Sequence, residues 1–243
     1  MPNPTAAILI IGDEILTGRT RDANMHHLAQ ELARAGIDLI EARFVRDDHD
    51  AIVRAVNDLR KAHDHVFTSG GIGPTHDDIT ADAVAAAFGV PIGIREDARA
   101  ILAAHYDRAG LEFNAARQRM ARIPEGATLI ENPISAAPGF SLGNVHVMAG
   151  VPDIFKAMVA SLLPRLTGGK PLMSQSWRVE QGEGVIATPL AELAAEFPDL
   201  SFGSYPFIQN GVHGSNIVVR GTDPARIDAA MARLAKLFPN PRV

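Results

Sequence analysis

The chain has 243 residues, 47% of them hydrophobic and 5% aromatic, and carries a formal net charge of -5 at pH 7. This length suits one medium domain followed by a small one, and the apolar content is sufficient for a packed core. Basic and acidic residues are mixed along the chain, so no basic patch is available to follow a nucleic-acid backbone, and we expect no DNA or RNA partner.

Cysteine is absent from the sequence, which excludes disulfides, thiolate nucleophiles and zinc sites with cysteine ligands. No apolar run approaches the roughly 18 residues that a membrane span requires, so no membrane partner is expected. Residues Met1–Pro4 contain no basic side chain and lead directly into a strand, which argues against a signal peptide. We therefore expect a cytoplasmic protein.

Apolar strands alternate with helices at the start of the chain. Thr5–Ile11 is a continuous apolar run of the kind that is buried on both faces of a parallel sheet. The next segments repeat the order helix, strand, helix, strand and helix over residues 23–35, 37–45, 51–62, 65–67 and 81–88. This alternation predicts a parallel sheet covered by helices on both sides. In such a sheet, ligands bind beyond the carboxyl ends of the strands.

The rest of the chain extends this domain and then changes character. We expect helices between residues 96 and 122, strands at 127–130 and 143–148, and a helix at 152–166. Thr167–Pro171 is the strongest linker signal and separates domains of residues 1–168 and 171–243. Beyond it we expect strands at 174–179, 200–208 and 216–219 and helices at 189–196 and 224–237. The predicted fold is a three-layer α/β domain with a mostly parallel sheet, followed by a small α+β domain.

Residues 68–80, with the sequence TSGGIGPTHDDIT, join the third strand to its helix. Glycine at three of four positions allows positive φ and close approach to another group, and the start of a helix attracts phosphate. Two adjacent carboxylates suit phosphate only with a cation between them, and Mg²⁺ is usually held by one or two carboxylates plus substrate phosphates. We therefore expect a metal-bound phosphate ligand at Gly70, Gly71, Gly73, Pro74, Thr75, His76, Asp77, Asp78 and Thr80.

A structural interpretation of the same segment stays open. It places Pro74 near the first turn of the helix and makes Asp77 or Asp78 the cap of that helix. The density of glycine, proline, threonine and aspartate within this segment favours the functional interpretation, because capping needs only one such side chain.

Further carboxylates follow the first two strands. Asp13 and Glu14 come directly after the first strand, and Asp47 and Asp48 follow the second. They are expected at the same sheet edge as the glycine loop, where carboxylates can bind a metal or accept a proton from an attacking water. The alternatives are solvated carboxylates at a strand end for the first pair and surface turn residues for the second. Spacing alone does not say which carboxylate is the base and which is a metal ligand.

Other catalytic motifs are disfavoured. Gly139–Gly143 matches the G-x-S-x-G nucleophile elbow by letters, but that elbow needs a helix after it. Asn144–Met148 predicts a strand instead, so we expect Ser141 in a hairpin and disfavour a serine hydrolase. The first strand is not followed by a Rossmann G-x-G-x-x-G, the chain contains no P-loop sequence, and the histidine pairs lack zinc-site spacing.

The segment GGIGPTHDDIT resembles the GG(I/L)GPTxDD signature of the molybdopterin-binding-like (MoCF biosynthesis) domain. That domain occurs in the competence/damage-inducible protein A (CinA) family and in the N-terminal half of animal FAD synthases. Two further stretches are similar to the family: Gly12–Gly18 with the following Asn24, and Asn114 with Gln118 and the segment PEGA that begins at Pro124. The resemblance covers residues 5 to 167, and the remainder is similar to the small domain that follows in CinA proteins.

The resemblance implies specific site residues. Glu14 matches a family Glu and Asp13 matches the variant in FAD synthases, while Asp47 and Asp78 align with aspartates of the molybdopterin adenylyltransferases. One position departs from the family, because Ile154 stands where a Glu is usual. Outside the glycine loop, the resemblance implies that the substrate-binding residues are Gly12, Asp13, Glu14, Asn24, Asn114, Gln118, Gly150 and Pro152.

The resemblance also implies a function, namely a metal-dependent pyrophosphatase acting on ADP-ribose or FAD. The expected catalytic residues are Asp77, Asp78 and Asp47, and the expected metal ligands are Asp77, Asp78 and Glu14. The cofactor would be Mg²⁺, Mn²⁺ or Co²⁺, with a monovalent cation as a second candidate. The alternative is a molybdopterin-binding or molybdenum-cofactor biosynthesis protein without hydrolase activity, and a third is an inactive regulatory module. The expected partner is a nucleotide, dinucleotide or pterin, in a dimer or trimer of the chain.

Overall fold

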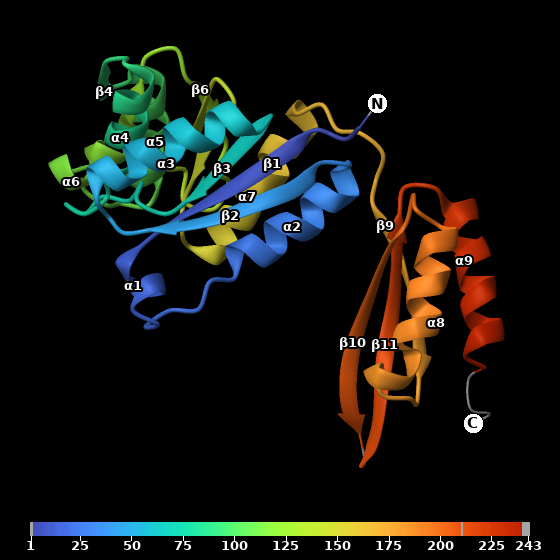
Figure 1. Ribbon diagram of the computed structural model, residues 1–243. Helices are drawn as coiled ribbons and strands as arrows, with labels where there is room; N and C mark the ends of the chain where they lie inside the picture. Colours follow the sequence, from blue (N-terminus) through green and yellow to red (C-terminus); the bar gives the residue numbers. More distant parts are fainter. Residues whose placement is uncertain (1, 210, 240–243) are drawn as a thin grey trace. The chain divides into compact units, whose positions relative to one another are not determined.

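The computed structural model describes residues 2–209 and 211–239 of the chain. The chain divides into two compact units, Met1–Gly169 and Lys170–Val243 (Figure 1). Residue 1 of the predicted first domain and residues 210 and 240–243 of the predicted second domain lie outside the described residues. Each unit has hydrophobic core residues of its own, as expected of a domain.

The first unit is built around a six-stranded sheet with the strand order β2-β1-β3-β8-β7-β6. Its parallel strands are β2 (Asp38–Val45), β1 (Thr5–Ile11), β3 (His65–Ser69) and β8 (Val145–Met148), and β7 (Gly139–Leu142) runs antiparallel between β8 and β6 (Thr128–Ile130). The expected mostly parallel sheet is confirmed. Ile11 pairs with Val45 and Ile10 pairs with Ser69, so the segments after β1, β2 and β3 start side by side.

Alternate residues of β1 enter two different cores. Ala7, Leu9 and Ile11 pack on one face of the sheet, and Ala6, Ile8 and Ile10 pack on the other. Core residues from the helices α3 (His49–Ala62), α4 (Thr80–Phe88) and α5 (Glu96–Arg108) join the first core, and those from α2 (Asn24–Ala35) and α7 (Pro152–Leu162) join the second. Helices therefore cover both faces of the sheet, which confirms the three-layer α/β prediction (Figure 1).

Several short elements differ from the expectations. The strands β4 (Ile92–Ile94) and β5 (Arg122–Pro124) form a two-stranded sheet that was not predicted, because three residues are too few to show a pattern. The helix expected over 152–166 ends at Leu162 and continues as a 3-10 turn over Leu163–Arg165, which contains Pro164. The predicted hairpin around Ser141 is confirmed, since β7 turns directly into β8.

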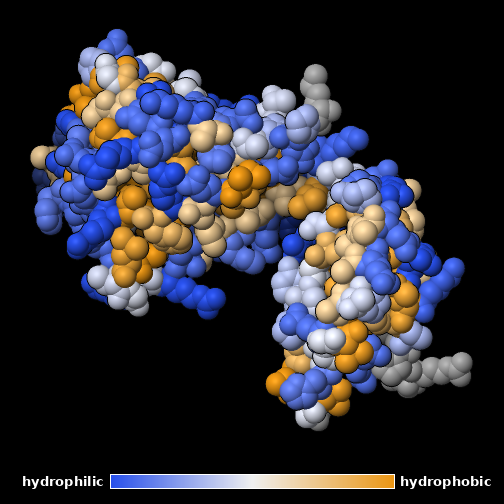
Figure 2. All heavy atoms as spheres, in the orientation of Figure 1, coloured by the Kyte–Doolittle hydropathy of each residue, from blue (hydrophilic) through white to orange (hydrophobic). Residues whose placement is uncertain are grey.

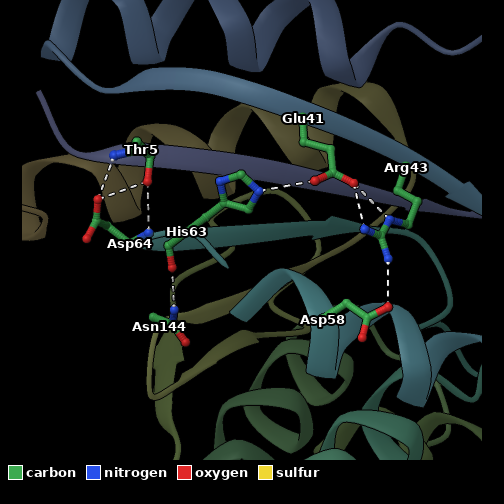
Figure 3. Close-up of polar contacts among 7 residues, drawn as sticks. All are labelled: Thr5, Glu41, Arg43, Asp58, His63, Asp64 and Asn144. Atoms are coloured by element: carbon green, nitrogen blue, oxygen red, sulfur yellow. Dashed lines mark hydrogen bonds and ion pairs between the residues drawn. The ribbon is translucent and has the colours of Figure 1, made fainter. Parts of the chain in front are cut away.

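A network of polar side chains joins elements at the amino ends of β1 and β3 (Figure 3). The Asp64 carboxylate accepts hydrogen bonds from the Thr5 backbone N–H at 2.8 Å and from the Thr5 hydroxyl at 2.9 Å. The Asn144 amide donates to the His63 carbonyl at 2.9 Å, and the His63 ring lies 3.2 Å from a Glu41 oxygen. These contacts fix the edge of the sheet that lies opposite the glycine loop.

The second unit is a three-stranded antiparallel sheet with two helices. Its strands β9 (Met173–Val179), β10 (Ser201–Gln209) and β11 (Val212–Gly221) take the order β10-β11-β9, and its helices are α8 (Glu183–Glu196) and α9 (Pro224–Leu237). Both helices pack on the same face of the sheet (Figure 1), where Ile217 and Val219 meet Leu193 and Leu234. The small α+β fold is therefore confirmed.

Two predicted elements of the second unit were too short, and the strand expected over 216–219 is Val212–Gly221. The helix predicted over 189–196 begins at Glu183, with Pro189 inside it. Proline usually marks a first helical turn because it lacks an N–H. Here the buried side chains of Ile186 and Leu193 extend the helix on both sides of the proline.

Hydrophilic residues dominate the visible surface, with hydrophobic residues gathered in smaller patches (Figure 2). Among the described helices, none combines the length and the apolar character that a membrane span would require.

Candidate functional site at the carboxyl edge of the sheet

The loops that follow β1, β2, β3 and β8 surround one pocket of about 510 Å³. The backbones are tightly packed here: the Gly12 N–H donates to the Val45 carbonyl at 3.2 Å, and a Cβ on Gly150 would lie 3.2 Å from the Gly70 Cα. Of the residues predicted for the site, the pocket is lined by Gly12, Glu14, Asp47, Gly70, Gly71, Gly73, Pro74, Asp77, Asp78, Gly150 and Pro152.

Two glycines of the loop after β3 have the expected backbone geometry. Gly70 has φ +110° and Gly71 has φ +70°, whereas Gly73 has no positive φ. A Cβ on Gly70 would lie 2.2 Å from the Ile11 carbonyl oxygen, and one on Gly71 would lie 2.1 Å from the Thr80 Oγ1. Side chains at these two positions are therefore excluded both by conformation and by space.

The side chains of Thr80 and Asp78 hold this loop in place by hydrogen bonds to other residues of the loop. Thr80 is fully buried, and its hydroxyl donates to the Gly70 carbonyl at 2.9 Å. One Asp78 oxygen accepts hydrogen bonds from the Thr75 N–H at 2.8 Å and from the Thr75 hydroxyl at 2.6 Å. Asp78 thereby closes a short turn within the loop, and Thr75 and Thr80 support the loop without lining the large pocket.

The capping interpretation of the loop is wrong. Helix α4 begins at Thr80, its N-cap residue is Ile79, and no side chain caps it. Pro74 therefore lies six positions before the helix rather than in its first turn. Asp77 and Asp78 line the pocket instead.

Four carboxylates line the same pocket: Glu14, Asp47, Asp77 and Asp78. Asp47 is half-buried and one of its oxygens accepts the Asp13 N–H at 2.9 Å. Burial raises the pKa of Asp47 above its usual range, the Asp13 N–H opposes this shift, and the negative charges of Glu14, Asp13 and Asp77 raise it further. The electrostatic effect of these neighbours indicates a concentration of negative charge that a cation would relieve.

The donor set suits a divalent cation that shares its coordination with a ligand. In residues 2–209 and 211–239, no three histidine, aspartate or glutamate side chains form a ready-made metal cage. Mg²⁺ commonly takes one or two carboxylates and completes its shell with water and substrate phosphate. The pocket lining includes four carboxylates, so one or two of them are available for such a cation.

Asp13 makes contacts that the sequence analysis did not predict. Its carboxylate receives two hydrogen bonds from the Arg46 guanidinium, at 3.0 and 3.1 Å. The Arg46 guanidinium holds the pKa of Asp13 below its usual range. Asp13 does not line the large pocket, and it acts on the site through the backbone N–H that it gives to Asp47.

Asn24 connects the start of α2 to two loops of the site. Its buried side-chain amide donates to the Ser69 hydroxyl at 2.8 Å and to the Gly150 carbonyl at 2.7 Å. It lines a smaller neighbouring pocket of about 60 Å³ that also includes Glu14. The predicted Asn24 therefore holds the edge of the site together.

Three further predicted residues also lie outside the large pocket. The His76 side chain is 98% exposed. Asn114 caps the short helix α6 (Ala115–Gln118) by accepting the Arg117 N–H at 3.1 Å, and the Gln118 amide donates to the Phe113 carbonyl at 3.1 Å. Asn114 and Gln118 thus shape the chain before β5.

The opposite wall of the pocket was missed by the sequence analysis. Asn132 is buried and fixes a tight loop by donating to the Ser135 hydroxyl at 2.6 Å and to the Ala137 carbonyl at 2.9 Å. Ala136 in this loop has φ +62°, which a non-glycine residue seldom adopts. The Asn-Pro pair at the start of the loop was the available turn signal. The missed lining residues are Ile11, Thr20, Ile72, Met120, Asn132, Ser135, Ala137, Ala149, Val151 and Ile154.

Comparison with known proteins identifies the family. The sequence model of a family described as a probable molybdopterin binding domain matches residues 7–168. The chain belongs to this family. A second model, described as the middle domain of FAD synthase, matches residues 171–243.

Individual relatives agree with this assignment. A probable FAD synthase from Caenorhabditis elegans is 30% identical over 259 residues, which cover 96% of this chain and 50% of that protein. A CinA-like protein from Citrifermentans bemidjiense is 37% identical over 167 residues, which cover 67% of this chain and 40% of that protein. The chain therefore spans half or less of these two relatives.

A solved structure supports the same fold. The crystal structure of the protein CinA from Thermoplasma acidophilum, described as having unknown function, matches with a TM-score of 0.62 and 32% sequence identity. The match covers 67% of this chain and 97% of that chain. The resemblance to CinA proteins and FAD synthases that the sequence motifs indicated is confirmed.

Proposed function

We propose that the chain hydrolyses the pyrophosphate bond of a nucleotide-sugar or dinucleotide of the ADP-ribose or FAD class, with the help of a divalent cation. The observation that carries the proposal is the meeting of four carboxylates and a positive-φ glycine loop around one pocket. A phosphate ligand needs close backbone approach, which the glycines allow, and a cation between its charge and the carboxylates.

The carboxylates divide into two roles in this proposal. Glu14, Asp77 and Asp78 are the side chains that would hold Mg²⁺, Mn²⁺ or Co²⁺, one or two of them at a time, since no three side chains of the described residues form a ready-made cage. A bound cation would neutralise phosphate charge and polarise a phosphoryl oxygen. The backbone of Gly70 and Gly71 lines the pocket and would lie against the phosphates. A side chain at either position would displace the loop, because its Cβ would clash with the Ile11 carbonyl or the Thr80 hydroxyl.

Asp47 is the proposed proton acceptor. Water adds to one phosphorus atom, the bridging P–O bond breaks, and Asp47 takes the proton that the water loses. The half-buried position and raised pKa of Asp47 suit this role, since a base works best when its pKa approaches the working pH. The Asp13 N–H holds one Asp47 oxygen in place and leaves the other available.

The remaining wall suits the uncharged part of such a substrate. Ile72, Met120, Val151 and Ile154 line the pocket with apolar side chains. Pockets of this kind bind flat ring systems by apolar contact and orient them by a few polar groups. The relative described as a probable FAD synthase makes FAD one of the first substrates to test.

A second function is favoured by the description of the matched family. The same glycine loop would hold the phosphate of a molybdopterin without hydrolysing it, as a molybdopterin-binding or molybdenum-cofactor biosynthesis protein would. In that case Asp47 would keep its structural contact with Asp13 and would have no proton to accept.

The decisive experiment is a screen for AMP release from ADP-ribose, FAD and NAD, and for phosphate release from ATP, with Mg²⁺, Mn²⁺ or Co²⁺. We expect turnover of ADP-ribose or FAD that requires the divalent cation and vanishes with chelator. Repeating the assay with and without K⁺ tests for the monovalent cation. Full activity in excess chelator would contradict the metal role. Tight molybdopterin binding without turnover of any substrate would favour the second function.

The glycine loop offers a test of binding alone. Gly71→Val places a Cβ 2.1 Å from the Thr80 Oγ1 at φ +70°, so the loop must move. We expect at least a tenfold loss of FAD affinity by flavin fluorescence, on the order of 1–3 kcal/mol of strain. Gly110→Val is the matched control, because Gly110 has φ +65° but open space around it. Equal FAD affinity of the two variants would remove the glycine loop from the ligand site.

We also propose that the chain forms a homo-oligomer, either a dimer or a trimer. Light scattering on the purified chain distinguishes these states from a monomer.

A further inference from the structure

The sheet of the second unit has one face that its helices do not cover. Trp177, Ile217 and Val219 point toward the helical core. The alternate residues point the other way, and strand pairing aligns Tyr205 with Asn216 and Asn216 with Arg178 in one row across the three strands. In the described part of this unit, both helices lie on the core side (Figure 1).

Two aromatic rings lie flat on this uncovered face. A Cβ on Gly203 would lie 3.1 Å from the Tyr205 ring, and a Cβ on Gly214 would lie 2.3 Å from the Phe207 ring. The rings therefore lie over glycine backbone rather than standing up from the sheet. Tyr205 remains 44% exposed. Tyr205 and Phe207 are two positions apart on β10, which spaces their Cα atoms by about 7 Å.

Two arginines accompany these rings. The Arg178 guanidinium carbon lies 3.7 Å from the centre of the Phe207 ring, and Arg178 also donates to the Gln209 side chain at 2.7 Å. Arg220 donates to the Tyr205 hydroxyl at 2.6 Å. Neither arginine forms an ion pair with a carboxylate in the described ranges, 2–209 and 211–239.

On the helical side of the same unit, arginines form ion pairs with carboxylates. There, Arg226 pairs with Asp199 at 2.7 Å and Arg233 pairs with Glu196 at 2.8 Å. The charges of these two arginines are therefore neutralised within the unit. Among the residues that the structure describes, the Arg178 and Arg220 guanidinium groups contact rings, an amide and a hydroxyl but no carboxylate, so their charge is available to an external anion.

We propose that this face binds single-stranded nucleic acid. Bases would stack on the exposed Tyr205 ring and on the guanidinium plane of Arg178, and the phosphates between them would pair with Arg178 and Arg220. Sheets with exposed aromatic residues recognise unpaired bases in this way, and every base offers a face for stacking. The inference does not depend on the proposed pyrophosphatase site.

The overall charge of the chain limits the strength of such a site. With a net charge of -5, the chain has no general affinity for polyanions, and the expectation of no nucleic-acid partner rested on that balance. The proposed site is local and engages about two phosphates, so the logarithm of affinity should fall with the logarithm of salt with a slope of about -1.4.

The test is fluorescence anisotropy of labelled oligo(dT) and oligo(rU) of about 12 nucleotides, titrated with the full chain at about 50 mM salt. We expect saturable binding that Arg178→Ala with Arg220→Ala weakens at least tenfold. Tyr205→Ala should weaken it about tenfold, since each stacked base contributes that order of affinity. The matched control is Arg226→Ala with Arg233→Ala, which removes the same charge from the helical side and should leave affinity unchanged.

Three results would overturn the proposal: no binding of either oligonucleotide, an equal loss in the control variant, or full competition by AMP at the same phosphate concentration. The last would show a mononucleotide site. Circular dichroism of each variant verifies that the unit is folded, and Arg178→Gln with Arg220→Gln provides a second charge-removing pair that keeps polar side chains on the face.

Discussion

Replacing Asp78 by asparagine should lower turnover of the substrate by about 10²-fold or more while leaving its binding nearly unchanged. Asparagine keeps the shape of aspartate and an oxygen that can accept both hydrogen bonds of Thr75, at present 2.8 and 2.6 Å long. The loop should therefore keep its conformation. The charge that a cation requires is lost, and that charge matters most when the phosphoryl group is transferred.

Two companion variants separate chemistry from loop structure. Thr75→Val removes the hydroxyl donor but keeps the backbone N–H to Asp78 and the carboxylate charge, so it should cost far less activity than Asp78→Asn. Asp47→Asn should lower turnover as Asp78→Asn does, with KM little changed. If Asp78→Asn melts the protein but the folded fraction keeps its full specific activity, Asp78 is structural. The chemistry would then have to rest on Glu14 or Asp47.

The main sheet was predictable because its signals are local. The apolar run Thr5–Ile11 is buried on both faces, as a continuous apolar strand in a parallel sheet must be. The positive φ of Gly70 and Gly71 was predictable as well, because clustered glycines after a strand serve few other purposes. The order of strands and helices then places their loops at one edge, which is why the glycine loop, Glu14 and Asp47 could be expected in one site.

The features that were missed depend on contacts between distant segments. The turn that Asp78 closes with Thr75 competes with the capping role that its position suggested. The Asn-Pro pair predicts a turn before Ala136, but nothing local indicates that this turn and Met120 line the same pocket as the glycine loop. The predicted start of α8 at Pro189 was wrong for the same reason. Burial of Ile186 and Leu193 on either side of Pro189 outweighs the preference of proline for the first turn of a helix.

Histidines that looked scattered along the sequence meet in the centre of the first unit. His146 on β8 is 3% exposed, its Nδ1 lies 2.9 Å from the Ser141 hydroxyl, and its Nε2 lies 3.2 Å from the Nδ1 of His65 on β3. Burial, together with the smaller effects of the charges of His65 and Arg165, lowers the pKa of His146 to about 3. Burial also lowers the pKa of His65. Both rings are therefore neutral in the folded protein at neutral pH.

This pair should make the protein acid-sensitive. Unfolding restores the pKa of His146 from about 3 to 6.5, so the unfolded chain binds the extra proton as pH falls below 6.5, and stability is lost progressively down to about pH 3. At about pH 4.5 the loss from His146 alone should be about 2 to 3 kcal/mol. Urea unfolding at pH 7 and pH 4.5 measures this loss in the free energy of unfolding. Between these two pH values the His146→Gln variant should lose about 2 to 3 kcal/mol less stability than the unaltered protein. His26 is exposed, so the control variant His26→Gln should lose as much stability between pH 7 and pH 4.5 as the unaltered protein. Equal acid losses in all three proteins would exclude His146 as the cause.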